Sequence, residues 1–355
     1  MQRESDSARA DLPESTADIT PRWLSDALQV DVRACSVLSG HEGTTGRAEL
    51  ALEHDAGEAL PTRLFVKLPP ASVEQQAFVL ESGMGAREAL FYRHAAPGLP
   101  MRVPRCYVAD CSEDGRRYIL LLEHLADSGC LFRPASQYSL PWVRRVLSAL
   151  AALHAHFWES PRFVGDLAWL QGPPFSPTGG KLLARALEQQ GNLLPALFRE
   201  LGELYLADPA AVHRLWREGP ETVQHGDPHD GNQFLDHGQP GFLDWGVVAR
   251  GPGMRDVGYF LAGTLRPEHR ARVPELLAFY RDELLARGIA SPPDAGALWQ
   301  QYQWHAFYVW VSCACTLGAG ERLQPSAFVL AALARLHPTL AAHGIADAVR
   351  AALRR

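Results

Sequence analysis

The change of pattern near residue 125 constrains the fold of this chain more than any other feature of its sequence. Before it, short stretches with strand character alternate with turns, at 32–38, 48–52, 64–68, 104–109 and 118–122. After it, apolar residues recur at helical spacing, as in 139–158 and about 298–317. We therefore expect an α+β protein, with an N-terminal antiparallel sheet lobe that carries a helix and a larger, mostly helical C-terminal lobe.

The same change of pattern gives the expected domain boundaries. The chain has 355 residues, enough for two lobes that each bury a core. We expect residues 1–18, which are polar and acidic, to be disordered or loosely attached. Residues 19–125 form the first lobe, whose first helix starts after the N-cap residue Thr20 with Pro21 at its first position. Residues 126–355 form the second lobe, in which 181–206 is predicted as one helix.

Composition narrows the possible locations and partners. No apolar run is long enough to cross a bilayer, and the N-terminus has no apolar signal-peptide core, so we expect no membrane partner. Six cysteines occur without a C-x-x-C pair, and we interpret them as reduced thiols of a cytoplasmic protein. The sequence does not indicate an oligomeric state.

Charge is distributed unevenly between the two expected lobes. Residues 1–125 carry 19 acidic and 13 basic residues, whereas the remainder carries 21 of each. The second lobe is therefore neutral and has no basic run, which argues against nucleic acid as a partner. Of the 34 basic residues only Lys67 and Lys181 are lysines, which draws attention to Lys67.

The densest group of polar residues is the segment 225–232, His-Gly-Asp-Pro-His-Asp-Gly-Asn, followed by Asp244 at the end of an apolar strand. Glycine and proline interrupt regular structure here, so the polar side chains are displayed on a tight loop. A carboxylate at Asp227 and an amide at Asn232 are able to point to one side of it. This arrangement suits phosphoryl transfer, in which one carboxylate orients and deprotonates a hydroxyl while the amide and the second carboxylate hold Mg²⁺.

Two other interpretations of this segment remain open. Asp227, Asp230 and Asn232 could cap helices and satisfy backbone groups of a turn. His225, Asp227, His229 and Asp230 could also be ligands of Zn²⁺ in a metal hydrolase, although no second cluster with ligand spacing occurs elsewhere.

The 225–232 loop and the Leu-Asp-Trp element at 243–245 resemble the aminoglycoside phosphotransferase and choline kinase-like superfamily, most closely its ecdysteroid-kinase-like phosphotransferases. Further matching segments occur in the expected order over roughly 40–261: Phe-Val-Lys-Leu-Pro at 65–69, Arg-Glu-x-x-Phe-Tyr at 87–92, Val-Pro-Arg-Cys-Tyr at 103–107, Leu-Leu-Leu-Glu at 120–123 and Gly-Pro-x-x-x-Asp-Val at 251–257. The resemblance implies a protein-kinase-like two-lobed fold and a small-molecule kinase that uses Mg²⁺ and ATP or GTP.

The resemblance also implies roles for individual residues. Asp227 is expected to act as the catalytic base, Asn232 and Asp244 to bind Mg²⁺, and Lys67 to contact the nucleotide phosphates while paired with Glu88. The remaining nucleotide-binding residues are expected in a glycine-rich turn and at the hinge between the lobes; they are Gly43, Thr44, Gly46, Glu123 and Leu125. Asp256 is expected to brace the catalytic loop. Taken alone, Lys67 is better interpreted as a solvated strand-end lysine, and Glu88 could simply be a surface helix residue.

The acceptor site is expected in the helical lobe, where aromatic residues are frequent. Trp245, Trp304 and Tyr308 could line a pocket for an apolar or ring-containing alcohol, although aromatics at helical spacing are more often core. Trp245 is the exception that we expect to line the pocket, because it follows Asp244 directly. The neutral lobe counts against a polycationic acceptor, but a metabolite, a steroid-like or hydroxy-acid compound, or an antibiotic in a resistance role all remain possible. A nucleotide-binding regulator without catalysis is the alternative function. A protein kinase is a weaker option, because its glycine-loop and activation-segment motifs are absent.

Overall fold

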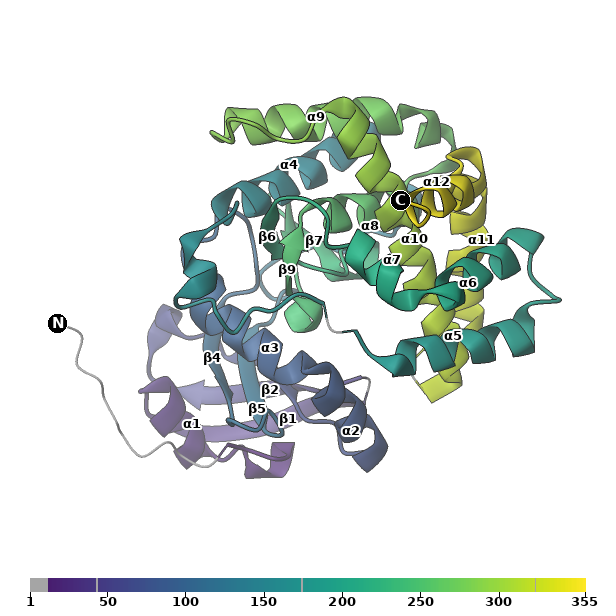
Figure 1. Ribbon diagram of the computed structural model, residues 1–355. Coiled ribbons are helices and arrows are strands. Elements are labelled where there is room, and N and C mark those ends of the chain that lie inside the picture. The colour runs from purple at the N-terminus through teal and green to yellow at the C-terminus, as the bar shows by residue number, and fades with distance from the viewer. Residues whose placement is uncertain (1–11, 43, 174, 323) are drawn as a thin grey trace. The chain divides into compact units, whose positions relative to one another are not determined.

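The structure is a computed structural model that describes residues 12–355 except 43, 174 and 323 (Figure 1). Contacts divide the chain into two compact units, and each is described by itself. The sheet unit comprises the described part of Met1–Gly98 with Val103–Leu131 and Leu243–Val247, and the helical unit comprises Leu99–Arg102, Phe132–Phe242 and Val248–Arg355. The short segment that contains Asp244 therefore packs with the sheet unit, although it follows the 225–232 loop in the sequence.

The strands of the larger sheet come early in the chain, as the sequence pattern predicts, and helices predominate later, interrupted by four short strands. The strands are β1 (Val32–Glu42), β2 (Gly46–His54), β3 (Arg63–Leu68), β4 (Cys106–Cys111), β5 (Tyr118–Glu123), β6 (Glu221–Gln224), β7 (Gln233–Asp236), β8 (Gln239–Phe242) and β9 (Ala249–Pro252). The α-helices are α1 (Pro21–Leu28), α2 (Val73–Ser82), α3 (Met84–Leu90), α4 (Leu140–His156), α5 (Pro177–Gln190), α6 (Ala196–Ala207), α7 (Pro209–Leu215), α8 (Met254–Thr264), α9 (Val273–Ala286), α10 (Ala295–Ala319), α11 (Ser326–Ala342) and α12 (Ile345–Ala352).

The sheet unit is built on a five-stranded antiparallel sheet in the order β1-β2-β3-β5-β4. All five strands coincide with the stretches predicted from sequence, and the expected α+β class is confirmed. Helix α1 also begins as predicted, because the Thr20 side chain accepts a hydrogen bond from the Trp23 N–H (3.2 Å) and Pro21 occupies the first turn.

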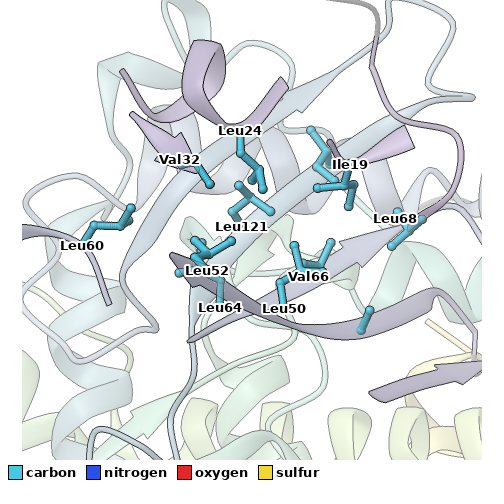
Figure 2. Packing of buried hydrophobic residues seen from close by; sticks show 12 residues of the cluster. Ile19, Leu24, Val32, Leu50, Leu52, Leu60, Leu64, Val66, Leu68 and Leu121 are labelled. Atoms are coloured by element: carbon cyan, nitrogen blue, oxygen red, sulfur yellow. The ribbon is translucent and has the colours of Figure 1, made fainter. Parts of the chain in front are cut away.

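One face of this sheet carries the core of the unit. Leu64, Val66 and Leu68 alternate along β3 and lie in a buried cluster with Leu121 of β5 and Leu24 of α1, which covers this face (Figure 2). Because successive side chains of a strand point to opposite faces, Lys67 projects to the other face of β3. That second face is the one against which α3 packs, so the strand period places Lys67 toward the helix that carries Glu88.

Only part of the N-terminal segment 1–18 belongs to the described residues. Residues 1–11 lie outside them, and the short 3₁₀ helix Thr16–Asp18 follows Ser15, whose side chain forms a capping box with Asp18. Leu12 packs against the buried cluster of the sheet unit.

The helical unit is organised around α10, a long helix that is apolar on almost all sides. Such a helix needs neighbours around its whole circumference, and α5, α8, α11 and α12 all contact it. Helices α4 and α9 lie side by side as a second pair (Figure 1). Helix α4 begins after Ser139, whose side chain accepts from the Trp142 N–H (3.4 Å), as its sequence predicts.

The single helix predicted at 181–206 is wrong. The chain forms two helices instead, α5 ending at Gln190 and α6 beginning at Ala196. Pro195 explains the break, since a proline lacks a backbone N–H and disfavours helical geometry in the residue before it. In the sequence, the apolar residues on both sides of this break obscured its effect.

Two small antiparallel sheets, β6-β9 and β7-β8, lie in the helical unit, and the segment Leu243–Val247 between β8 and β9 belongs to the sheet unit. The loop between β6 and β7 contains His225 to Asn232, so regular structure fixes both of its ends. No single helix in the described part of the chain is long and apolar enough to cross a membrane, whereas α11 and α12, bent by 68°, meet that test only as a pair.

Candidate active site

The loop from His225 to Asn232 presents the Asp227 side chain, which remains about one third exposed (34%). The loop leaves β6 through Gly226, whose φ of +89° is a backbone conformation that a residue with a Cβ rarely adopts. His229 then caps a short 3₁₀ helix, Asp230–Asn232, by accepting from the Gly231 N–H through its Nδ1 (2.9 Å). The glycine and the cap together hold Asp227 at the turn between two fixed strands.

Asp256 braces this loop from α8, as the family resemblance implies. Its Oδ2 accepts from the His225 N–H (2.6 Å), its Oδ1 accepts from the Gly226 N–H (2.8 Å), and the His154 Nε2 lies 3.2 Å from Oδ2. Burial raises the pKa of Asp256, but the hydrogen bond and charge of His154, with further help from the loop, outweigh burial, so the pKa lies below its ordinary value. Asp256 is fully buried and therefore positions the loop rather than meeting a substrate.

Asn232 lies beside Asp227 and is 7% exposed. Its Nδ2 donates to the Asp227 backbone oxygen (3.0 Å) and toward the Asp227 Oδ2 (3.3 Å). This orientation uses the amide nitrogen for the loop and leaves the amide oxygen as the group of Asn232 that suits a hard cation.

The Asp227 carboxylate has two further neighbours. The His229 Nε2 lies 3.5 Å from its Oδ2, and the hydroxyl of Tyr259 donates a hydrogen bond to it. Burial raises the pKa of Asp227, but His229 and Tyr259 outweigh it, so the pKa lies below its ordinary value and the carboxylate is ionised at neutral pH. The sequence analysis missed Tyr259; its position three residues after Asp256 on α8 was the available signal.

In the sheet unit, Lys67 is the centre of a charged cluster. Its Nζ lies 2.9 Å and 2.8 Å from the two carboxylate oxygens of Glu88, which confirms that pair, and 2.8 Å from the Asp244 Oδ1. The side chains of Lys67 and Glu88 are only 5% and 2% exposed. Burial alone lowers the pKa of Lys67, but the carboxylates of Asp244 and Glu88 outweigh it and the pKa lies above its ordinary value.

Asp244 has an uncommon backbone conformation for a residue with a side chain, with φ at +64°. Its Oδ2 lies 3.3 Å from a guanidinium nitrogen of Arg47, which the sequence analysis did not consider. Arg47 of β2 stands opposite Lys67 in the β2–β3 ladder, so both cations share one face of the sheet. Strained residues of this kind concentrate at functional sites, and here the strain directs a carboxylate toward two cations.

The glycine-rich turn is described only in part. Gly43 lies outside the described residues, and Thr44 is half-buried. A Cβ at Gly46 would meet the backbone oxygen of Pro69 at 2.8 Å. The close approach of the backbone just after β3 is therefore a sufficient reason for a glycine at this position. A role for Thr44 and Gly46 toward a nucleotide stays a prediction.

Glu123 and Leu125, predicted at the hinge, end β5 and start the following turn. The Glu123 N–H donates to the Arg105 oxygen (2.8 Å), and the Leu125 oxygen accepts from the Cys130 N–H (3.0 Å). These bonds leave the Leu125 N–H as the backbone donor to consider for a nucleobase.

Of the three aromatic residues predicted for an acceptor pocket, one belongs to the sheet unit and two belong to the helical unit. Trp245 belongs to the sheet unit, is fully buried and stacks on Phe91 with centroids 3.9 Å apart. Trp304 is 4% exposed in the helical unit, where its backbone oxygen accepts from the Trp216 indole (2.9 Å). Tyr308 is half-buried on α10, under the Arg255 guanidinium. Their pocket role stays a prediction, and the packing of Trp245 is that of a core residue.

No group of three or more His, Cys, Asp or Glu side chains within the described ranges is arranged to hold a metal ion.

This chain is similar to a known protein family and to several solved structures. The model of the phosphotransferase enzyme family matches residues 38–305, which is well over half of the chain. No curated protein matches the sequence of this chain.

Solved structures share the fold at low identity. A putative aminoglycoside phosphotransferase from Ralstonia eutropha is 14% identical with a TM-score of 0.56, over 93% of this chain and 97% of that one. The GDP complex of a mutant aminoglycoside 2′-phosphotransferase-IIIa is 13% identical with a TM-score of 0.54 (90% and 95%). An amicoumacin kinase in complex with AMP-PNP, Ca²⁺ and Ami is 11% identical with a TM-score of 0.53 (88% and 88%). These structures confirm the expected fold class, and the family model confirms the expected superfamily.

Proposed function

This chain belongs to the phosphotransferase enzyme family, and on that premise we propose that it transfers the γ-phosphoryl group of ATP or GTP to a small-molecule hydroxyl, with Asp227 as the base. Family membership makes it a phosphotransferase with an alcohol group as acceptor. The observation that carries the assignment of the base is the loop geometry: Asp227 is partly exposed and ionised, on a loop that buried Asp256 fixes through two backbone N–H groups.

The proposed step is a single displacement. Asp227 accepts the proton of the acceptor hydroxyl as the oxygen of that hydroxyl forms a bond to the γ-phosphorus. The bond between that phosphorus and the β–γ bridging oxygen breaks, which gives the phosphate ester and the nucleoside diphosphate. Because phosphoryl transfer depends mainly on positioning and electrostatics, the fixed loop is the main contribution of this part of the chain.

Mg²⁺ is the metal proposed for the site, with Asn232 and Asp244 as its protein ligands. The amide oxygen of Asn232 and the carboxylate of Asp244 are both hard oxygen donors, as Mg²⁺ requires, and the family is compatible with a divalent cation. When bound, the metal would neutralise charge on the phosphates. Among the structural relatives, one is a GDP complex and another contains AMP-PNP and Ca²⁺, which supports testing both purine nucleotides and more than one cation.

Lys67 is proposed to contact the nucleotide phosphates, and the backbone N–H of Leu125 is proposed to donate a hydrogen bond to the nucleobase. The ammonium group has three N–H donors, and the two oxygens of Glu88 and one of Asp244 occupy all three. A phosphate at Lys67 therefore replaces the Asp244 contact, and this exchange frees Asp244 for the metal.

A phosphorylation screen tests the proposal. The purified protein is incubated with Mg²⁺, ATP or GTP and a diverse set of hydroxyl compounds that includes antibiotics, and mass spectrometry detects the gain of a phosphoryl group. Asp227→Asn should lower kcat by roughly 100-fold to 10,000-fold while nucleotide affinity changes little, as expected for loss of a general base. Asp208→Asn, which changes an exposed N-cap residue of α7 in the same way, is the matched control and should retain activity.

Transfer that persists in Asp227→Asn would contradict the assignment of the base. Nucleotide binding by the native protein, without transfer or nucleotide hydrolysis under any condition, would indicate a regulator instead of an enzyme.

A further inference from the structure

Arg255 is a buried cation of the helical unit that no carboxylate neutralises. It lies in the first turn of α8 and is 7% exposed. Within the described ranges its guanidinium forms no ion pair, and its Nε donates to no partner. Arginine is almost never buried this far without a partner, since an uncompensated buried charge is costly.

The Arg255 guanidinium packs against an aromatic ring. Its guanidinium lies over the Tyr308 ring, 3.7 Å from the centroid, and Trp216 packs edge-on against the same ring at 5.2 Å. Burial raises the pKa of Tyr308 despite Arg255, so this phenol stays neutral. The cation–π contact stabilises one face of the guanidinium, but its Nε–H still requires an acceptor.

Arg255 is linked to the candidate base through two tyrosines of the helical unit. Residues four apart on a helix share a face, so Arg255 and Tyr259 project from the same side of α8. The Tyr259 hydroxyl donates to the Asp227 carboxylate, and its ring lies 6.1 Å from that of Tyr308. A chain of contacts thus connects the base, Tyr259, Tyr308 and the buried cation, all within the helical unit.

A second arginine adds to the positive charge of this region. Burial lowers the pKa of His213 to about 4, and Arg255 and Arg217 both contribute in the same direction. His213 is therefore neutral, and no carboxylate is among the groups that shift it. An acceptor with several ammonium groups would be repelled here, whereas an anionic acceptor would be attracted.

We propose that Arg255 binds an anionic oxygen group of the acceptor, so that the substrate is an alcohol that also carries a carboxylate or a similar anion. This inference rests on the proposed function, because it concerns the molecule whose hydroxyl Asp227 deprotonates. The planar guanidinium binds both oxygens of a carboxylate at once, which fixes orientation as well as charge. The acceptor anion thereby supplies the ion-pair partner that Arg255 lacks among the described side chains.

Matched acceptors test the proposal. Lactate and mandelate are compared with lactamide and mandelamide, which keep the hydroxyl and the shape but lose the charge, and with the corresponding amino alcohols. For whichever skeleton is phosphorylated, kcat/KM should be at least about 10-fold higher for the acid than for the amide, and lowest for the amino alcohol.

Variants of Arg255 separate charge recognition from general damage. Arg255→Met, which keeps an apolar stem over Tyr308, should lower kcat/KM for the acid by roughly 10- to 100-fold and leave the amide within about twofold. Arg272→Gln, an exposed arginine paired with Glu275, is the control and should change neither value. If Arg255→Met does not fold, Arg255→Lys is used instead. Lysine keeps the positive charge but cannot bind both carboxylate oxygens through a planar guanidinium, so the ratio of kcat/KM for acid to that for amide should fall to a value between those of the native protein and of a protein without the charge.

A second readout does not depend on turnover. The hydroxy acids should raise the thermal midpoint of the native protein in the presence of AMP-PNP and Mg²⁺, and should not raise that of Arg255→Met. Faster turnover or stronger stabilisation by amides or amino alcohols overturns the proposal and leaves the kinase assignment intact. If no acceptor is phosphorylated, this binding comparison alone decides, and equal midpoints with acid and amide overturn the anion site.

Discussion

The Lys67 Nζ lies 2.8 Å from the Asp244 Oδ1, although the two residues are 177 positions apart. The same nitrogen contacts both oxygens of Glu88, so one buried lysine joins a strand, a helix and the segment that follows the catalytic loop. Because that segment belongs to the sheet unit, the proposed metal ligand Asp244 is fixed by the same lysine that is proposed to meet the phosphates. Loss of Lys67 should therefore affect both stability and nucleotide binding.

Lys67→Met tests this dual role. Removing one partner of a buried pair leaves Glu88 charged and uncompensated, which typically costs about 3–5 kcal/mol of the free energy of unfolding. Urea denaturation measures this loss, and the double variant with Glu88→Gln should recover a large part of it. Nucleotide affinity should stay low in both variants. Lys181→Met, a change of the exposed second lysine, is the matched control.

A fully stable Lys67→Met protein would contradict the cost assigned to burial of the Glu88 charge. Unchanged nucleotide affinity would remove Lys67 from the proposed phosphate site.

Tyr259→Phe should change the pH dependence of transfer. The base must be ionised, so activity falls as pH drops through the lowered pKa of Asp227. The Tyr259 hydrogen bond is one of the interactions that keep this pKa low, and without it the acid limb of the kcat/KM profile should move to higher pH. kcat should also fall by about 10-fold, since a hydrogen bond to a charged group is lost. An acid limb at the native pH would exclude Tyr259 as a positioning residue for Asp227.

Tyr302→Phe is the control for this comparison. Tyr302 is also buried in the helical unit, and its hydroxyl lies 2.8 Å from the His343 Nδ1. This variant loses one buried hydrogen bond of similar kind, so its acid limb should not move.

The sequence predicted the parts of this structure that depend on local pattern. The five strands of the sheet follow from alternation and turn residues, and the caps at Thr20 and Ser139 follow from short side chains that accept backbone N–H groups. The pair of Lys67 and Glu88 and the bracing contact of Asp256 were implied by the family resemblance, and both are confirmed.

Contacts that arise only from tertiary packing were not predictable in this way. Arg47 meets Asp244 because of strand register, and Tyr259 meets Asp227 because α8 folds beneath the loop. The gap between α5 and α6 was also missed, since apolar periodicity continues across it while Pro195 prevents one helix. The spacing of apolar residues predicts which face of a helix or strand is buried, but it does not predict which other helix, strand or loop covers that face.

Substitutions of Trp245 test whether this residue belongs to the core or lines an acceptor pocket. Its full burial and its stack on Phe91 predict that Trp245→Ala costs about 3–5 kcal/mol of the free energy of unfolding, as for other large core aromatics. Trp245→Phe should retain most of the stability because a ring still stacks on Phe91. Urea denaturation gives both values. A stable Trp245→Ala protein with a raised KM for the acceptor would instead support the pocket role predicted from sequence.

Asp256→Asn should disconnect the brace from the catalytic loop. The carboxylate accepts from the N–H groups of His225 and Gly226 at once, whereas an amide offers only one oxygen and would direct its own NH₂ group at one of these donors. A buried donor left unsatisfied costs about 1–3 kcal/mol, and kcat should fall more than nucleotide affinity because the loop carries Asp227. Asp294→Asn, at the N-cap of α10, is the control, since asparagine caps a helix about as well as aspartate does.

The pH dependence of stability gives this last prediction a second, independent readout. The pKa of Asp256 is lower in the folded protein than its ordinary value, so its contribution is complete above about pH 4 and is lost as pH falls through the folded pKa. The free energy of unfolding, measured by urea at a series of pH values, should therefore differ between native protein and Asp256→Asn near neutrality and converge in acid. A difference that stays constant down to the lowest pH would mean that the ionised carboxylate is not what holds the loop.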